Sequence, residues 1–375
     1  MARPMGSVRL KKANPLTLAL GVLLCVFIVV FLVAPSGSST NSHRLDPVTA
    51  QHHLSPPTSP YRKPSSRSGI QLKPPPVAHY NLNNVTITTS PIENRENVLI
   101  LTPMARFYQG YWDNLLKLSY PHELITLGFI LPKTKEGNQA TTDLQDRIHK
   151  TQKHGPEQDR FKSIIILRQD FEPALQSQDE SERHKMQNQK ARREVMAKAR
   201  NSLLFTTLGP DTSWVLWLDS DIIETPPNLI QDLAAFDKPL IVPNCFQRYY
   251  DEEHQHMAER PYDFNSWQDS PTALELASKM GPDDILLEGY AEMATYRTLM
   301  AYLTTEDGDR RAVIPLDGVG GTALLVKADV HRDGAMFPPF SFYHLIETEG
   351  FAKMAKRLGW QPWGLPNYKV YHYNE

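Results

Sequence analysis

The chain of 375 residues is predicted to fold as an α/β protein, with a mostly parallel sheet that is flanked by helices. Two observations predict this class. From residue 97 onward, short apolar runs alternate with segments of helical spacing, an order typical of parallel sheets. One run, residues 214–218 (Trp-Val-Leu-Trp-Leu), is apolar throughout, as expected for a central strand covered on both faces. In such folds, ligands bind beyond the carboxyl ends of the strands.

The N-terminal segment is predicted to anchor the chain in a membrane. Residues 1–15 carry four basic residues and no acid, and residues 16–34 carry no charge. As a helix, the uncharged run would cover about 28 Å, close to one bilayer core. It is longer than the ~7–15 apolar residues of a cleavable signal peptide. Because the basic residues precede the span, we expect a cytosolic N-terminus and a lumenal remainder.

Residues 35–95 are predicted to form a stem without a core. Ser and Pro dominate this stretch and large apolar residues are few, so it cannot bury enough surface to offset the entropy of ordering. Asn84-Val85-Thr86 is an N-glycosylation sequon, which is usable only if the segment is lumenal. We therefore place the globular domain at residues 96–375.

Composition and short motifs exclude several classes of function. The net charge of −2 gives no signal for nucleic-acid binding, and no nucleic-acid partner is expected. The two cysteines, Cys25 and Cys245, lie far apart, so no disulfide framework is implied. The chain contains neither G-x-x-x-x-G-K nor G-x-G-x-x-G, the phosphate-loop and dinucleotide fingerprints.

The first part of the globular sequence alternates regularly between strands and helices. We predict strands at residues 98–102, 124–131, 163–167, 214–218 and 240–245. We predict helices at residues 107–118, 141–153, 176–205 and 227–236. Thr102 and the residues that follow Leu218 then lie at the same edge of the sheet, where strands end.

The second part of the globular sequence breaks this alternation. Residues 246–267 mix acids, histidines and aromatics, and are either a solvated loop or a wall for a polyhydroxy acceptor. Residues 315–322 contain three glycines before an apolar run, where backbone can approach a ligand closely. Residues 347–350 read as an acidic first turn of a helix that continues through 351–358. Residues 368–373 form an aromatic strand that carries His372.

Asp219-Ser220-Asp221 directly follows the central strand. Since side chains alternate along a strand, Asp219 and Asp221 are expected to leave the same face at its carboxyl end. Two neighbouring carboxylates favour a cation beside them. Oxygen ligands suit Mg²⁺ or Mn²⁺, whose other positions suit phosphate oxygens. The alternative is that both acids only end the strand and cap the next helix, because the tripeptide D-x-D often occurs by chance without a function. His372 is a candidate third ligand, although a lone histidine is usually structural.

Together these motifs resemble a known family. The order of the D-x-D, the glycine loop, Glu347-Thr348-Glu349 and His372 is similar to that of metal-dependent GT-A glycosyltransferases. Residues 99–106, 111–115, 191–201, 346–356 and 370–373 resemble the fungal mannan polymerase subunits more narrowly. Those subunits are type II membrane proteins of the Golgi and α-1,6-mannosyltransferases of glycosyltransferase family 62. The resemblance covers about residues 95–375.

The resemblance implies a fold, a reaction and partners. It implies a GT-A fold, GDP-mannose as the donor, Mn²⁺ (or Mg²⁺) as the cofactor, and retention at the anomeric carbon. It also implies an N-glycan mannose acceptor and a complex with other mannan polymerase subunits in the cis-Golgi membrane. A retaining enzyme can use the departing phosphate as its base, so no nucleophile is named.

The resemblance further implies a role for each matching residue. Asp221 and His372 would bind the metal, and Asp219 would touch the ribose or the metal. Residues expected along the nucleotide are Thr102, Pro103, Arg106, Gly320 and Gly321. Arg192 would face the diphosphate or the sugar, and Asp263, Glu347 and Glu349 would lie near the mannose or the acceptor. Of these, Arg192, Glu347 and Glu349 are the expected catalytic residues, and Asp263 is expected to contact the sugar or the acceptor. For Arg192 the alternative is an ordinary surface arginine within a basic cluster that includes Lys190 and Arg193.

Two other functions stay open. Asp219-x-Asp221-x-Ile223 resembles a phosphatase-type aspartate motif, but such enzymes open their domain with that strand, whereas here globular sequence lies upstream. Alternatively, the chain is a non-catalytic scaffold subunit that keeps its site for nucleotide binding or folding. Transfer activity with GDP-mannose and a short α-mannoside would separate these possibilities.

Overall fold

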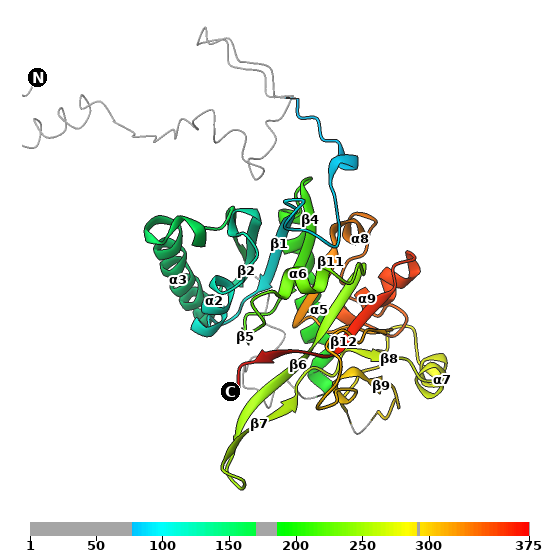
Figure 1. The fold of residues 1–375 in the computed structure, drawn as a ribbon. Coiled ribbons are helices and arrows are strands. Elements are labelled where there is room, and N and C mark those ends of the chain that lie inside the picture. The colour runs from blue at the N-terminus through cyan, green and yellow to red at the C-terminus, as the bar shows by residue number, and fades with distance from the viewer. Residues whose placement is uncertain (1–76, 170–185, 291–292, 375) are drawn as a thin grey trace, which may run out of the picture. The chain divides into compact units, whose positions relative to one another are not determined.

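The structure, a computed structural model, describes residues 77–169, 186–290 and 293–374. The predicted tail at 1–15, the predicted anchor at 16–34, most of the predicted stem and the start of the predicted helix 176–205 lie outside the described residues. Among the residues described, no helix has the length and apolar character needed to cross a membrane. The fold described here belongs to the unit Ala78–Glu375 (Figure 1).

A ten-stranded sheet organises this unit. Hydrogen-bonded neighbours follow the order β10-β12-β6-β11-β4-β1-β2-β3, while β5 pairs with β12 and β7 pairs with β6. Its strands are β1 (Asn97–Pro103), β2 (Ile125–Pro132), β3 (Ser163–Gln169), β4 (Thr212–Leu218), β5 (Ile222–Glu224), β6 (Leu240–Asp251), β7 (His256–Pro261), β10 (Ile314–Pro315), β11 (Ala323–Lys327) and β12 (Pro362–His372). A small second sheet pairs β8 (Trp267–Gln268) with β9 (Thr298–Leu299).

The N-terminal half of the sheet is parallel, as predicted. β1 pairs with β2 and β4, and β2 pairs with β3. The helices in this half are α2 (Gln109–Leu116), α3 (Lys135–His149) and α5 (Met186–Thr207). α3 begins earlier than the predicted helix at 141–153, because the Thr134 hydroxyl caps it by accepting a hydrogen bond from Gly137 N at 3.1 Å.

β4 is buried along its whole length, and its side chains alternate between two cores. Trp214, Leu216 and Leu218 belong to the core under α2, α3 and α6 (Leu229–Ala234). Val215 and Trp217 belong to the core under α5, α8 (Ala328–Arg332) and α9 (Glu347–Arg357). Helices therefore cover both faces of the sheet, which confirms what the unbroken apolar run predicts.

The sheet as a whole is mixed, which corrects the prediction of a mostly parallel one. β11 runs antiparallel between β4 and β6, and β5, β7 and β10 also pair antiparallel. A short apolar run fits either direction, so the residues of β11 do not specify its direction. The glycine loop before it returns the chain at the carboxyl end of β4, where Asp219 N donates to Thr322 O at 3.0 Å.

A β-hairpin replaces most of the segment predicted as a loop or an acceptor wall. β6 continues to Asp251 and returns as β7, with Gln247 opposite Arg260 in the register. Figure 1 shows this two-stranded ribbon running out of the main sheet. The acids and histidines at its tip lack the Gly-containing turn signals that mark short hairpins in a sequence. From the end of β7 onward, residues 261–265 border the site described below.

Packed structure begins upstream of residue 96. The hydroxyl of Tyr120 donates to the carbonyl oxygens of Pro91 and Glu96, at 3.2 and 2.5 Å. The Glu96 carboxylate accepts a hydrogen bond from Trp214 Nε1 at 2.7 Å, inside the core. The last residues assigned to the stem thus pack against the globular domain.

The C-terminal elements complete the sheet and one core. Ser270 caps the N-terminus of α7 (Pro271–Lys279), and its side chain accepts a hydrogen bond from Ala273 N. α9 has acids in its first turn and Lys356 and Arg357 in its last, which suits the helix dipole and confirms the predicted helix there. β12 is longer than the predicted strand at 368–373 and places His372 at its end, beside β6.

Candidate functional site

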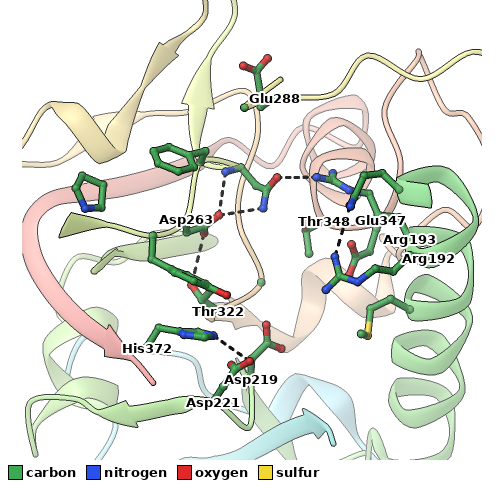
Figure 2. A pocket seen from close by; sticks show the side chains of 18 of the residues that line it. Arg192, Arg193, Asp219, Asp221, Asp263, Glu288, Thr322, Glu347, Thr348 and His372 are labelled. Atoms are coloured by element: carbon green, nitrogen blue, oxygen red, sulfur yellow. Dashed lines mark hydrogen bonds and ion pairs between the residues drawn. The ribbon is translucent and has the colours of Figure 1, made fainter. Parts of the chain in front are cut away.

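A cavity of about 570 Å³ opens at the carboxyl end of β4 (Figure 2). Its wall is formed by α5, the turn after β4, the base of the β6–β7 hairpin, the start of α9 and the end of β12. The predicted site residues that line it are Arg192, Asp219, Asp221, Asp263, Gly321, Glu347 and His372. Side chains far apart in the sequence therefore converge where the fold class predicts a ligand.

Asp219 is held by Arg200, a residue that no sequence motif marks. Arg200 on α5 donates from Nη2 to Asp219 Oδ1 at 2.8 Å and from Nε to Glu347 Oε1 at 3.1 Å. Its guanidinium carbon lies 5.4 Å from the ring centroid of Trp217, a cation–π contact. The pKa of Asp219 is raised to about 6, chiefly by burial and also by the nearby Asp221, while Arg200 opposes this shift. Arg200 thereby keeps this carboxylate in place next to a second one.

Asp221 lies against His372, with Oδ2 and Nε2 3.0 Å apart. The other ring nitrogen, Nδ1, lies 2.5 Å from the carbonyl oxygen of Tyr373, so Nδ1–H donates there and Nε2 faces Asp221. Tyr262 stacks on the imidazole with ring centroids 3.7 Å apart. Burial lowers the pKa of His372. The hydrogen bond to Asp221 and the negative charge of that carboxylate raise the pKa, and the net result lies above the ordinary value for histidine.

This pair fits a divalent cation. A histidine that binds a metal typically donates its other N–H to a carbonyl or carboxylate, as His372 does. Neighbouring ligands of an octahedral ion, each about 2.1 Å from the metal, are about 3 Å apart. That spacing matches the 3.0 Å between Asp221 and His372. Within the described part of the chain, no group of three or more His, Cys, Asp or Glu side chains is arranged to hold a metal. The predicted set of three ligands therefore stays a prediction, with Asp219 turned toward Arg200.

Asp263 reaches the cavity from the segment after β7 (Figure 2). Its Oδ1 accepts hydrogen bonds from the backbone N of Asn265 at 2.9 Å and from the Asn265 side chain at 3.0 Å. Burial raises the pKa of Asp263, and the Asn265 hydrogen bonds oppose that shift. The carboxylate is fixed and faces the same space as the D-x-D acids.

The glycines of residues 318–321 make room for side chains of the site. A Cβ at Gly320 would lie 1.6 Å from Asp263 Oδ2, and one at Gly321 would lie 2.7 Å from Arg200 Nη2. Gly321 lines the cavity, whereas Gly320 lies behind Asp263. The sequence predicts that both glycines let a nucleotide approach closely. In the structure, the groups that approach them closely are the protein's own aspartate and arginine.

Glu349 lies behind the cavity wall rather than on it, and its predicted place near the mannose or the acceptor stays a prediction. It is fully buried, and Trp267 Nε1 donates to its Oε1 at 2.9 Å while Arg193 pairs with its Oε2. Arg193 also donates to Asn265 Oδ1 at 3.0 Å. Glu349 therefore supports Arg193 and, through Asn265, the carboxylate of Asp263.

The residues predicted along the nucleotide at the end of β1 do not line the cavity. Thr102 is fully buried; its hydroxyl donates to Leu218 O at 2.8 Å and lies 2.6 Å from Tyr111 Oη. Pro103 ends β1 and Arg106 is exposed. Thr102 ties β1 to the end of β4, and a nucleotide role for these three residues rests on the resemblance alone.

A cavity-lining acid in the loop between α7 and β9 was also missed. Glu288 accepts hydrogen bonds from Arg297 Nη1 at 2.6 Å and from Thr295 Oγ1 at 2.8 Å. Arg297 itself lies over the Trp267 ring, 3.5 Å from its centroid. Burial raises the pKa of Glu288, although Arg297 lowers it. No local motif marks these residues, because each acts only through a partner on another segment.

The chain is similar in sequence to proteins of one known family. A model of the Anp1 family matches residues 76–341. The mannan polymerase complex subunit MNN9 of Candida albicans is 48% identical over 373 residues, covering 97% of this chain and 97% of that one. The mannan polymerase complex subunit mnn9 of Schizosaccharomyces pombe is 57% identical over 296 residues, covering 79% of this chain and 86% of that one.

Similar solved structures are more remote. The mannosyltransferase PcManGT from Pyrobaculum calidifontis, in complex with GDP-Man and Mn²⁺, is 12% identical with a TM-score of 0.39, over 79% of this chain and 60% of that one. S. aureus TarS in complex with UDP is 11% identical with a TM-score of 0.35, over 74% and 58%. Neither similarity is close enough to carry an argument about this chain.

Proposed function

The chain belongs to the Anp1 family, and from this premise we propose that it is a glycosyltransferase of a mannan polymerase complex. The reaction we propose is transfer of mannose from GDP-mannose to an N-glycan mannose, with an α-1,6 linkage and retention, by a GT-A fold. The observation that carries the proposal is the Asp221–His372 pair, 3.0 Å apart at the wall of a cavity that arginines also line.

The cavity suits a charged small molecule in size and in lining. Its volume of about 570 Å³ falls within the range of small-molecule sites, about 300–1,000 Å³. Arg192 and Arg193 line one side of it from α5, and Asp219 and Asp221 line another. A metal-bound nucleoside diphosphate carries both negative phosphates and a positive metal ion. The arginines suit the phosphates and the aspartates suit the metal.

Each wall would contribute one part of the chemistry. Asp221 and His372 would hold Mn²⁺ or Mg²⁺, which when bound supplies electrostatic stabilisation of the leaving diphosphate. Arg192 would stabilise the same developing charge from α5. Asp263 and Glu347 would accept hydrogen bonds from sugar hydroxyls and so orient the reacting ring. Asp263 is suited to this because Asn265 already fixes one of its oxygens.

Transfer activity tests this proposal. The purified full-length chain, in detergent, is incubated with GDP-mannose, Mn²⁺ and a short α-mannoside. We expect an α-1,6-linked product with the wild type and none with Asp221→Asn. Tight GDP binding without transfer, alone and with partner subunits, would favour the scaffold alternative. A trapped aspartyl phosphate would favour the phosphatase alternative.

We also propose a single-pass type II protein of the cis-Golgi membrane, with residues 16–34 as its anchor and residues 96–375 in the lumen. The basic charge before residue 16 supports this orientation. In sealed microsomes, protease should leave everything beyond Ala34 intact until detergent is added. A C-terminus that is digested without detergent would overturn both the topology and the lumenal reaction.

A further inference from the structure

Gln247, on β6, is the cross-strand neighbour of two cavity residues. In the register of the sheet it lies opposite Arg260 of β7 and opposite His372 of β12. Three adjacent strands thus place Arg260, Gln247 and His372 in one row across the sheet. Gln247 is buried, and all three residues line the cavity.

Hydrogen bonds connect the three residues continuously. Gln247 Oε1 accepts from Arg260 Nε at 2.8 Å and from Arg260 Nη2 at 2.6 Å. Gln247 Nε2 donates to the carbonyl oxygen of Tyr373 at 2.9 Å. The same carbonyl accepts from His372 Nδ1 at 2.5 Å. One buried amide therefore orients both a guanidinium and the carbonyl that fixes the imidazole tautomer.

Arg260 differs from the buried arginines of the cavity in its charge balance. Arg193 is paired with Glu349, and Arg200 is paired with Asp219 and Glu347. Within the described residues, Arg260 has no carboxylate partner; it contacts the neutral Gln247 amide and lies over the Tyr249 ring, 5.3 Å from its centroid. Arg260 is exposed, so water rather than a carboxylate solvates its charge, and Gln247 binds only one edge of the guanidinium.

We propose that Arg260 binds the diphosphate of the nucleotide-sugar donor and that Gln247 positions both Arg260 and His372. This inference rests on the function proposed above. A guanidinium oriented along one edge offers its other N–H groups to phosphate oxygens. Arg260 and His372 lie on opposite sides of Gln247, on β7 and β12. Arg260 would therefore neutralise, from a second side, a diphosphate bound next to His372.

The first test measures GDP affinity of the full-length protein by calorimetry, with Mn²⁺ and with a chelator. Arg260→Gln should weaken GDP binding about 10- to 100-fold, the range for one charge-assisted hydrogen bond. The loss should appear in both conditions, because it removes a contact of the protein and not of the metal. Arg248→Gln is the matched control: Arg248 lies on the same hairpin but pairs with Glu224 and Glu259, outside the cavity. It should leave GDP affinity unchanged.

The second test isolates the role of Gln247. Gln247→Leu removes the hydrogen bonds to Arg260 and to Tyr373 together. It should weaken GDP binding in chelator as Arg260→Gln does, and should also raise the Mn²⁺ concentration needed for half-maximal GDP binding. Arg260→Gln should leave that Mn²⁺ requirement at the wild-type value. If Gln247 only stabilised the fold, Gln247→Leu and Arg260→Gln would not differ in the Mn²⁺ concentration that they require.

The outcomes separate this inference from the proposed function. If the wild type does not bind GDP, the proposed function fails. If the wild type binds GDP and Arg260→Gln binds it equally well, only the role of Arg260 is overturned. Unchanged GDP affinity with lost transfer would place Arg260 at the acceptor instead and would also overturn the inference. An unchanged Mn²⁺ requirement in Gln247→Leu would contradict the positioning of His372.

Discussion

A Cβ atom on Gly320 would lie 1.6 Å from Oδ2 of Asp263, so the aspartate occupies space that only a glycine leaves free. Gly320→Ala should therefore displace the Asp263 carboxylate from the cavity. We expect at least a tenfold loss of transfer activity, because misplacement of a reacting or orienting group by about 1 Å costs on the order of 10²-fold. The measurement is kcat/KM with GDP-mannose and an α-mannoside.

The control for this prediction is Gly209→Ala, where the nearest atom to a Cβ is Asp211 Oδ1 at 3.0 Å, the end of a side chain outside the cavity. It should keep wild-type activity. Full activity in Gly320→Ala, in a protein that melts at the wild-type temperature, would contradict a role for the position of Asp263.

The sequence predicts the parts of this site that are encoded locally. The run at 214–218 predicts β4 because burial on both faces requires apolar residues at every position, and Asp219 and Asp221 follow it directly. Arg200 and Gln247 carry no such signal. Their roles depend on partners that folding brings to them: Gln247 meets Tyr373 across 126 positions of sequence. The antiparallel direction of β11 was missed for the same reason, since pairing between distant segments sets it.

His372→Ala should weaken Mn²⁺ binding and also lower the melting temperature. The first effect follows from loss of a ligand to a weak divalent site, and the second from loss of the stack on Tyr262, with centroids 3.7 Å apart. We expect a destabilisation of about 1–3 kcal/mol. Tyr262→Ala is the control, because it removes the same stack but keeps the imidazole.

Titration of both variants with Mn²⁺ separates the two roles. Both should melt earlier than the wild type, and only His372→Ala should need more Mn²⁺ to bind GDP. If the two variants require the same Mn²⁺ concentration, His372 is a structural histidine.

Glu349→Gln should destabilise the fold even though Glu349 does not line the cavity. The change removes the charge that balances buried Arg193, and breaking a buried ion pair costs about 3–5 kcal/mol. Chemical denaturation measures the loss. Glu275→Gln, in the exposed pair with Lys279, should cost less than about 1 kcal/mol. Similar losses in the two variants would show that the Arg193–Glu349 pair contributes little to stability.

Stability should fall in acid partly because of His331. Burial lowers the pKa of His331 to about 4, and the ring accepts a hydrogen bond from Trp217 Nε1. Because the folded pKa lies below the unfolded value of about 6.5, the folded state favours the neutral ring. Its contribution is complete above pH 6.5 and is lost as the pH falls toward 4.

Between pH 7 and pH 5 this single group should cost about 2 kcal/mol of unfolding free energy. His331→Gln does not titrate, so the difference in stability between the two pH values should shrink by that amount. Denaturation curves of both proteins at both pH values give the comparison. An identical pH dependence would exclude His331 as the group responsible.

We propose that the cavity holds a nucleoside diphosphate through a divalent cation bound at Asp221 and His372. Calorimetric titration of the full-length protein with GDP, with Mn²⁺ and then with a chelator, tests it most directly. We expect GDP to bind at least tenfold more tightly with Mn²⁺ than with a chelator, and more tightly than UDP. In Asp221→Asn, Mn²⁺ should no longer increase the affinity for GDP. Equal GDP affinity with Mn²⁺ and with chelator would contradict the metal site, and preference for UDP would contradict the mannose donor.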